Sequence, residues 1–164
     1  MAREKEKKHL ENLSYVDSLT YAQNRNHFNE YIEKNRRKEL HSVGVIYLDL
    51  NGLKEINDKM GHLAGDTLII SASYVLQEIF ADNSYRIGGD EFVVIEQDVL
   101  ESEFMSKYNK LLVRMKELEI SVATGYIWKE RCLNLSEILQ AADQKMYEDK
   151  KRYYSIAQKD RRRR

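Results

Sequence analysis

The sequence predicts a single mixed α/β domain, a sheet flanked by helices, with a short helical lead-in at its N-terminus. Stretches rich in β-branched and aromatic residues alternate along the chain with stretches of helical period, which is typical of this class. The 164 residues are enough for one ordinary domain with tails, and the 42% of apolar residues can fill a core of that size. No internal repeat or low-complexity linker divides the sequence.

Composition excludes secreted scaffolds and membrane-spanning proteins. The longest uninterrupted apolar stretch, residues 43–48, is far too short to cross a bilayer, and 33% of all residues are charged. Residues 2–8 are charged instead of apolar, so we expect no signal peptide. The single cysteine, Cys132, cannot form an internal disulfide. We therefore expect a cytoplasmic protein with no membrane insertion of its own.

The net charge of zero conceals an uneven distribution. Residues 1–8 and 150–164 are rich in Lys and Arg, and without them residues 9–149 retain 15 of the 27 bases and 24 of the 27 acids. An acidic body binds nucleic acid poorly, because phosphate contacts supply most of that affinity. We expect no nucleic-acid partner, and interpret residues 159–164 as a basic, solvated tail.

The elements follow from periodicity and from the turn residues between them. Residues 3–16 predict a polar helix that is marginal alone and resembles the end of a connector. Residues 42–50 are nearly all apolar and β-branched, which predicts a strand buried on both faces. The other predicted elements are helices over residues 24–40, 53–59, 65–80, 103–117 and 136–150, and strands over residues 84–87, 91–96, 120–127 and 153–157, the last at an edge.

Acidic residues at two strand ends predict a metal site. Gly88 and Gly89 precede Asp90 and Glu91 between two short strands, which predicts a hairpin whose glycines adopt positive φ; an exposed hairpin tip is the plain alternative. Asp49 favours a metal site over an exposed hairpin tip, because a carboxylate at the end of such an apolar strand needs a partner, for example a divalent cation. If the strand pairs with the hairpin, Asp49 and Asp90 converge on one Mg²⁺ or Mn²⁺.

A Gly-punctuated segment between these acids carries side chains suited to guanine. The Asp66 carboxylate can accept from N1–H and the exocyclic amine, and the Asn57 amide can serve the N7 and O6 edge. Roles at helix ends explain the two residues equally well. Lys54 and Lys150 are candidates for phosphate contacts, although a single surface lysine is commonly only solvated.

Together these motifs resemble the GGDEF family of diguanylate cyclase domains over roughly residues 17–150. RIGGDEF carries the signature, and DSLTYAQNRNHF, DLNGLKEIND with GHLAGD, SVATGYI and AADQKMYEDK are similar to the family's other motifs in order. The resemblance implies a palm-like α+β fold with a central, mostly antiparallel five-stranded sheet flanked by helices. It divides the chain into a connector helix (1–16) from an absent upstream sensor, a catalytic domain (17–158) and a basic tail (159–164).

The resemblance also implies an activity. Two domains, each holding one GTP, would face each other as a homodimer and form cyclic di-GMP and pyrophosphate with Mg²⁺. The implied metal ligands are Asp49, Asp90 and the Leu50 carbonyl, and Asp90 or Glu91 would assist deprotonation. The chain would be the output domain of a bacterial sensor, either free in the cytoplasm or the cytoplasmic part of a membrane-anchored protein. The residues implied to bind GTP are Asn57, Asp66, Leu53, Lys54, Lys150, Gly88 and Gly89.

Departures from the family pattern leave alternatives open. Tyr21 replaces a glycine, Asn51 replaces a second acid, and Tyr154 stands where the family has a phosphate-contacting Arg, for which Arg152 is a possible substitute. Ile79 replaces the Arg of the product-inhibition motif, so we expect no tight feedback by product. The main alternative is a GTP-binding or dimerising regulatory module without turnover. A cyclase that uses ATP is disfavoured, because adenine offers a carboxylate such as Asp66 the wrong donor pattern.

Overall fold

The sheet has four antiparallel strands in the order β2-β3-β1-β4. The structure is a computed structural model that describes residues 1–163. The side chains of residues 11–13 are not described. Arg164, the end of the expected basic tail, lies outside the described residues. The strands are β1 (Leu40–Leu50), β2 (Ser84–Arg86), β3 (Glu91–Glu96) and β4 (Val122–Cys132). The helices are α1 (Ala2–Tyr15), α2 (Arg25–Asn35), α3 (Leu53–Met60), α4 (His62–Phe80), the 3₁₀ turn η1 (Ala81–Asn83), α5 (Glu101–Glu117) and α6 (Leu135–Arg163).

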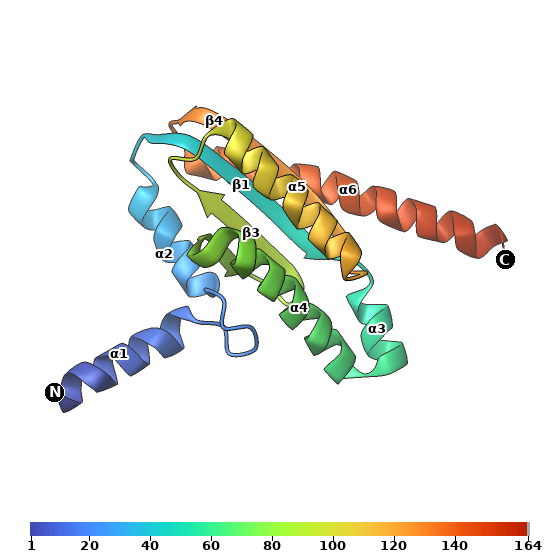
Figure 1. Cartoon of the computed structure of the whole chain (residues 1–164), viewed down its shortest axis with the longest axis horizontal. Coiled ribbons are helices and arrows are strands. Elements are labelled where there is room, and N and C mark those ends of the chain that lie inside the picture. Colours follow the sequence, from blue (N-terminus) through green and yellow to red (C-terminus); the bar gives the residue numbers. More distant parts are fainter. Residues whose placement is uncertain (164) are drawn as a thin grey trace.

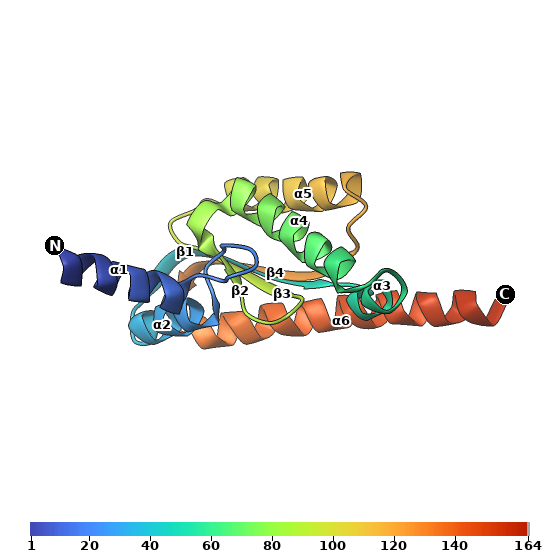
Figure 2. The same ribbon diagram turned by 90° about the horizontal axis from the view of Figure 1, so that it is seen from below.

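Helices cover both faces of the sheet, α4 and α5 on one and α2 and α6 on the other (Figure 2). Alternate residues of β1 supply the two cores. Val45 and Tyr47 belong to the core beneath α2 and α6, whereas Ile46 and Leu48 belong to the core beneath α4 and α5. The predicted strand buried on both faces is confirmed, and β1 pairs with β4 from Leu40 to Leu50 and with β3 over residues 44–49.

The expected fifth strand over residues 153–157 is wrong. These residues continue α6, which runs unbroken for 29 residues from Leu135 to Arg163 and extends beyond the sheet (Figure 1). No proline or glycine ends the helix, and the Lys, Arg, Gln and Ala residues there favour helix over strand. The sheet therefore has four strands instead of five, and residues 159–163 of the expected tail are helical.

The lead-in helix projects from the body of the domain (Figure 1). The link to α2 fixes its base, because the Asn24 side chain caps α2 and also donates to the Ser14 carbonyl at 2.9 Å. Its role as a connector stays a prediction. Among residues 1–163, no helix is both long enough and apolar enough to span a membrane.

Candidate active site

Sheet pairing brings the predicted metal ligands together. Asp49 pairs with Glu91 in the β1–β3 register, and the Leu50 N–H donates to the Asp90 carbonyl at 2.9 Å. The end of the central strand therefore lies directly beside the turn of the hairpin, as the sequence predicted. Asp49 belongs to the face of β1 that is covered by α6.

A lysine from α6 completes this group. The Lys150 Nζ lies 2.6 Å from an Asp49 carboxylate oxygen, although 101 residues separate the two along the chain. The position of α6 explains the contact, because Gly125 of β4 lets the helix approach so closely that an added Cβ would lie 2.3 Å from the Ala142 carbonyl oxygen. Met146 lies on the buried face of α6, and one turn further along the same helix carries Lys150 to the end of β1.

The electrostatics of Asp49 fit a cation. Burial raises the pKa of its carboxyl to about 6, and the neighbouring Asp90 adds to the rise, while the hydrogen bond and charge of Lys150 oppose it. The Asp49 Oδ1 atom is buried and has no hydrogen-bond partner. A buried carboxylate with one unpartnered oxygen, a second carboxylate beside it and a nearby backbone carbonyl are hard oxygen ligands of the kind Mg²⁺ binds.

That donor set is small. No group of three or more His, Cys, Asp or Glu side chains in residues 1–163 is arranged to hold a metal ion. The expected set, with two carboxylates and one carbonyl, does not require such a group. Substrate phosphates and water ordinarily fill the remaining positions around Mg²⁺. The residues present therefore fit a metal that is shared with a phosphorylated substrate.

Glu91 lies in an environment that favours its protonated form. Burial raises the pKa of its carboxyl, the negative charges of Asp143 and Asp90 raise it further, and the charges of Lys150 and Arg25 oppose them. Asp143, which sequence reasoning missed, comes from α6. Its helical spacing of seven residues from Lys150 places both on one face of α6, but that signal has meaning only once the helix is known to cross this end of the sheet.

Two arginines hold the hairpin turn in place. Arg86 donates to the Gly89 carbonyl at 2.8 Å and pairs with Asp17 at 3.0 Å. Arg25 donates to the Ile87 carbonyl at 2.9 Å. Sequence reasoning had assigned no role to either arginine, although both lie within the quoted motifs. Arg86 ties the turn to the segment before α2, and Arg25 ties it to the start of α2.

The expectation that the two glycines of the turn adopt positive φ is wrong. Neither Gly88 nor Gly89 has positive φ; the glycines that do are Gly52 and Gly61. A Cβ at Gly89 would meet no atom within 4 Å, and one at Gly88 would meet only the Glu91 side chain. The turn spans Ile87 to Asp90, longer than a two-residue hairpin loop, and needs no left-handed residue. The glycines instead leave an open, bare backbone beside the carboxylates.

The predicted guanine ligands meet where α3 and α4 face each other. The Asn57 amide packs so closely on α4 that a Cβ at Gly65 would lie 1.8 Å from its Oδ1, an atom that is buried and has no hydrogen-bond partner. Asp66 follows Gly65 and is half-buried. The structure therefore brings the Asn57 amide beside the backbone that carries Asp66.

The other expected ligands are placed differently. Leu53 packs against the core beneath α4 and α5, whereas Lys54 is exposed. Lys54 lines a hollow of about 220 Å³ between α3 and α6, and Lys150 lines a separate one of about 380 Å³ along α6. Arg152, the expected substitute for the missing arginine, is exposed and lies 3.9 Å from Asp149. The structure does not gather these cations around one point.

Comparison with known proteins supplies the family. The family model described as "Diguanylate cyclase, GGDEF domain" matches residues 14–154. The chain belongs to the GGDEF family. Signaling protein YkoW of Bacillus subtilis is 34% identical over 93% of this chain, and the probable diguanylate cyclase DgcI of Escherichia coli is 30% identical over 85%. The cyclic di-GMP phosphodiesterase PdeR of Escherichia coli is 30% identical over 82%.

The chain is much shorter than these relatives. It spans 22% of YkoW, 32% of DgcI and 22% of PdeR. Among solved structures, the coiled coil and GGDEF domain of DgcB from Caulobacter crescentus matches with a TM-score of 0.75 and 21% identity, over 92% of this chain and 89% of that one. A microbial GGDEF domain studied with cyclic di-GMP matches with a TM-score of 0.71 and 28% identity, over 86% and 93%. These likenesses confirm the predicted fold class.

Proposed function

We propose that the chain is the diguanylate cyclase domain of a longer bacterial signalling protein. It would condense two GTP molecules into cyclic di-GMP and pyrophosphate with Mg²⁺ or Mn²⁺. One observation carries the proposal: the carboxylates of Asp49, Asp90 and Glu91 gather with the Lys150 ammonium at the end of β1. A regulatory domain that bound no metal would have little reason to bury an Asp49 oxygen without a partner.

Each part of GTP has residues suited to it. Asp49, Asp90 and the Leu50 carbonyl would hold the metal, which supplies charge neutralisation for phosphoryl transfer when bound. Asn57 and Asp66 would bind the guanine edge. The open backbone of the turn lets phosphates approach without a Cβ in the way. The cations and glycines assigned to the triphosphate are Lys54, Lys150, Gly88 and Gly89, and Leu53 is the remaining residue assigned to GTP binding.

The reaction is a phosphoryl transfer between two bound nucleotides. The 3′-oxygen of one GTP forms a bond to the α-phosphorus of the other as the bond to pyrophosphate breaks, and two such steps close the ring. Asp90 or Glu91 accepts the proton from the 3′-hydroxyl. The raised pKa of Glu91 makes its carboxylate a stronger base than an ordinary glutamate, which suits this task. The lysines stabilise the negative charge of the departing pyrophosphate.

One domain binds one GTP, so turnover requires a homodimer. The projecting α1 is suited to join the chain to an upstream sensor and to bring two copies together, and we place the protein in the cytoplasm.

Ile79, which stands in place of an arginine, packs partly buried against the core beneath α4 and α5. We therefore expect no inhibition by low micromolar product. Inhibition at that level, relieved by Asp82→Ala, would contradict this expectation.

A regulatory module without turnover is the second candidate. Tyr154 is exposed and offers no cation where the family has an arginine, and Tyr21 occupies a glycine position with φ of 60°. Two relatives of this chain, PdeR and NbdA of Pseudomonas aeruginosa, are named as phosphodiesterases. A GGDEF domain thus also occurs in proteins that are named for a different activity.

The deciding experiment is incubation of the purified chain with GTP and Mg²⁺, followed by chromatography for cyclic di-GMP and pyrophosphate. Product that rises more steeply than linearly with protein concentration supports a cyclase with a dimeric site. Replacing Mg²⁺ with EDTA should remove the product. GTP binding without product at any protein concentration would contradict the proposal and support the regulatory module. Competition by ATP at equal concentration would contradict the assignment of guanine to Asp66.

A further inference from the structure

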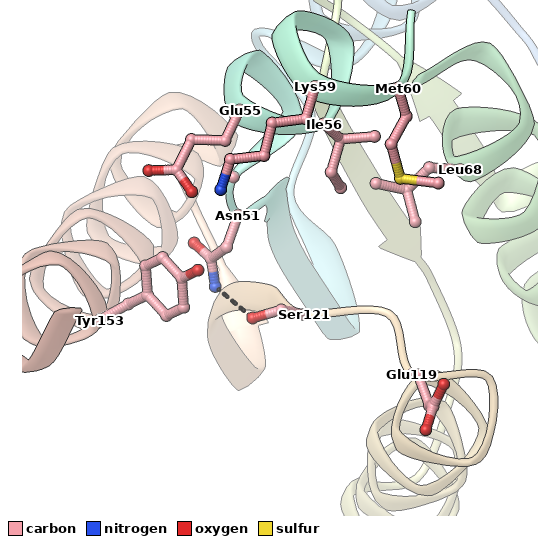
Figure 3. Close-up of a pocket in the computed structure, with 10 residues that line it drawn as sticks. Asn51, Glu55, Ile56, Lys59, Met60, Leu68, Glu119, Ser121 and Tyr153 are labelled. Carbon is pink, nitrogen blue, oxygen red and sulfur yellow. Dashed lines mark hydrogen bonds between the residues drawn. The ribbon is translucent and has the colours of Figure 1, made fainter. Parts of the chain in front are cut away.

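Two hollows near the candidate site differ in the charges that line them. Behind α3, a hollow of about 250 Å³ is lined by the Lys59 ammonium and by the carboxylates of Glu55 and Glu119 (Figure 3). Along α6, the hollow of about 380 Å³ that contains Lys150 is lined by no acid among the side chains that the structure describes. Walls of mixed charge select no ligand charge, whereas walls that carry only cations attract an anion. The hollow along α6 therefore defines the charge of its ligand.

Every residue that lines this α6 hollow carries a hydrogen-bond donor. The residues are two lysines, two tyrosines, a serine and a glutamine, namely Tyr147, Lys150, Lys151, Tyr154, Ser155 and Gln158. The neighbouring acids on the helix, Glu148 and Asp149, do not line it, and Asp149 instead accepts a hydrogen bond from the Thr124 N–H at 2.9 Å. Two ammonium groups and four neutral donors suit an anion with many acceptor oxygens, such as a chain of phosphates.

The α6 hollow adjoins the candidate metal site through Lys150. The Nζ of this lysine lies 2.6 Å from an Asp49 carboxylate oxygen. On the other side, Tyr154 and Gln158 also line the hollow that contains Lys54. An anion in the α6 hollow therefore lies next to the carboxylates that would share a metal with GTP, and the phosphates of that same GTP are the anion at hand.

Lys151 is a cation of the α6 hollow that has no acidic partner. Its Nζ lies 4.5 Å from the centre of the Tyr147 ring, and it forms no ion pair with any residue that the structure describes. An exposed cation–π contact is weaker than a hydrogen bond from an ammonium to a phosphate oxygen, so a phosphate can draw Lys151 from the ring. Arg152, the substitute cation considered in the sequence analysis, does not line the hollow and faces Asp149 at 3.9 Å.

We propose that Lys151 binds the terminal phosphate of GTP and that the α6 hollow holds the end of the triphosphate. The inference rests on the proposed function, because the metal ligands and the guanine residues place the rest of the nucleotide. Lys150, beside Asp49, contacts the phosphate nearer the metal, and Lys151 contacts the next phosphate outward. The Tyr154 hydroxyl and the Gln158 amide donate to the remaining oxygens.

The test measures binding instead of turnover. The probes are GMP and the α,β-methylene analogue of GTP, whose α- and β-phosphorus atoms are joined through carbon so that pyrophosphate cannot leave. Isothermal titration calorimetry of the purified chain with Mg²⁺ gives both affinities. Lys151→Gln should weaken binding of the analogue about ten-fold, the value of one hydrogen bond to a charged group, and leave GMP unchanged. Lys151→Arg should recover most of that affinity, because it restores the charge.

The helix offers a matched control. Lys145 is also on α6, with its Nζ 5.7 Å from the centre of the Tyr126 ring, and it does not line the hollow, so Lys145→Gln should change neither affinity. Arg152→Gln tests the alternative cation and should weaken the analogue less than about two-fold. Lys145, Lys151 and Arg152 are all exposed, so the three glutamine variants should unfold at the wild-type midpoint.

Three results would overturn the assignment of Lys151. Equal affinity of the wild-type chain and Lys151→Gln for the analogue would mean that this lysine stays on the Tyr147 ring. An equal loss of affinity for GMP would place Lys151 beside another part of the nucleotide. A loss in Arg152→Gln or Lys145→Gln as large as that in Lys151→Gln would mean that only the overall charge of α6 matters.

These results are distinguishable from failure of the proposed function. If Lys151→Gln shows the expected loss and the wild-type chain still forms no cyclic di-GMP from GTP, the cyclase proposal fails and Lys151 remains a phosphate-binding residue. If the wild-type chain forms cyclic di-GMP and Lys151→Gln binds the analogue normally, only the assignment of Lys151 fails. A wild-type chain that binds neither nucleotide would overturn both.

Discussion

The two halves of the candidate site are held in very different ways. The hairpin turn is fixed by Arg86 and Arg25, which donate to the Gly89 and Ile87 carbonyls at 2.8 and 2.9 Å, and by its pairing with the end of β1. Helix α3 has no buried residue. It begins after Gly52, with φ of 70°, and ends at Gly61, with φ of 87°, so a glycine in a left-handed or related conformation flanks it on each side.

The difference teaches where this domain needs rigidity. Carboxylates that share a Mg²⁺ must be held close to the productive geometry, because Mg²⁺ demands near-ideal octahedral coordination. A base-binding surface tolerates more adjustment, because its hydrogen bonds form as the base arrives. We infer that the hairpin half is ordered in advance and that α3 is held less firmly, by the contact between Asn57 and Gly65 and by the partly buried Leu53.

The largest effect is expected in the rigid half. Asp90→Asn removes a charge at nearly constant volume, and should lower kcat for cyclic di-GMP by about a thousand-fold or more. The fold should persist, since the hydrogen bond from the Leu50 N–H goes to the Asp90 backbone carbonyl. Pyrophosphate release and the unfolding midpoint are the measurements. Asp82→Asn, at an exposed position outside the site, is the matched control. Retained turnover in Asp90→Asn would contradict the ligand assignment.

Hydrogen exchange tests the comparison directly. The amides of α3 should exchange about a hundred-fold faster than those in the middle of β1, because a helix without buried residues opens without unfolding the core. Mass spectrometry of peptides that cover residues 53–60 and 43–49 gives the two rates. Equal protection in the two peptides would mean that α3 opens only with the whole domain, and the contrast between the halves would be lost.

A glycine substitution separates the two halves by activity. In Gly65→Ala, the new Cβ would lie 1.8 Å from the Asn57 Oδ1, so the amide must move away from the proposed guanine site. We expect the KM for GTP to rise about ten-fold with little change in unfolding free energy, because alanine favours helix and α3 can shift.

Gly125→Ala is the matching substitution in the rigid half. Its new Cβ would lie 2.3 Å from backbone atoms of α6, which should lower the free energy of unfolding by about 3 kcal/mol. A lower stability in Gly65→Ala than in Gly125→Ala would reverse the comparison.

Strand pairing made the hairpin half predictable. A strand that is nearly all apolar is central, and a Gly-Gly-Asp turn beside it places Asp90 near Asp49 once the two strands pair. The contact from Lys150 was not predictable in the same way. It depends on how closely α6 crosses β4 at Gly125, which is a property of packing between elements and not of a local pattern.

The errors also have local causes. An edge strand was expected over residues 153–157, but helix propensity over the surrounding residues prevailed and these residues continue α6. At the hairpin, positive φ was expected at Gly88 and Gly89, whereas neither glycine has it and arginine side chains hold the turn. The conformation of the turn therefore depends on distant partners as well as on its own residues.

The smallest expected effect concerns the anchor of the rigid half. Burial of Asp17 opposes its charge, but hydrogen bonds from Thr20 and from Arg86, together with the charge of Arg86, hold the pKa of this carboxyl below its ordinary value of 3.8. A lowered pKa in the folded state means that the ion pair stabilises the fold above about pH 4 and that this stability is lost as the pH falls through the folded value. Asp17→Asn should therefore cost about 1 kcal/mol of unfolding free energy near neutral pH, and progressively less as the pH falls below about 4 and the wild-type carboxyl takes up its proton. Urea unfolding near neutral pH and at an acidic pH measures the difference, with Asp82→Asn as the control. A loss that is the same at both would mean that Asp17 acts through its neutral hydrogen bonds, and Arg86 would then have to hold the hairpin turn without a charged anchor.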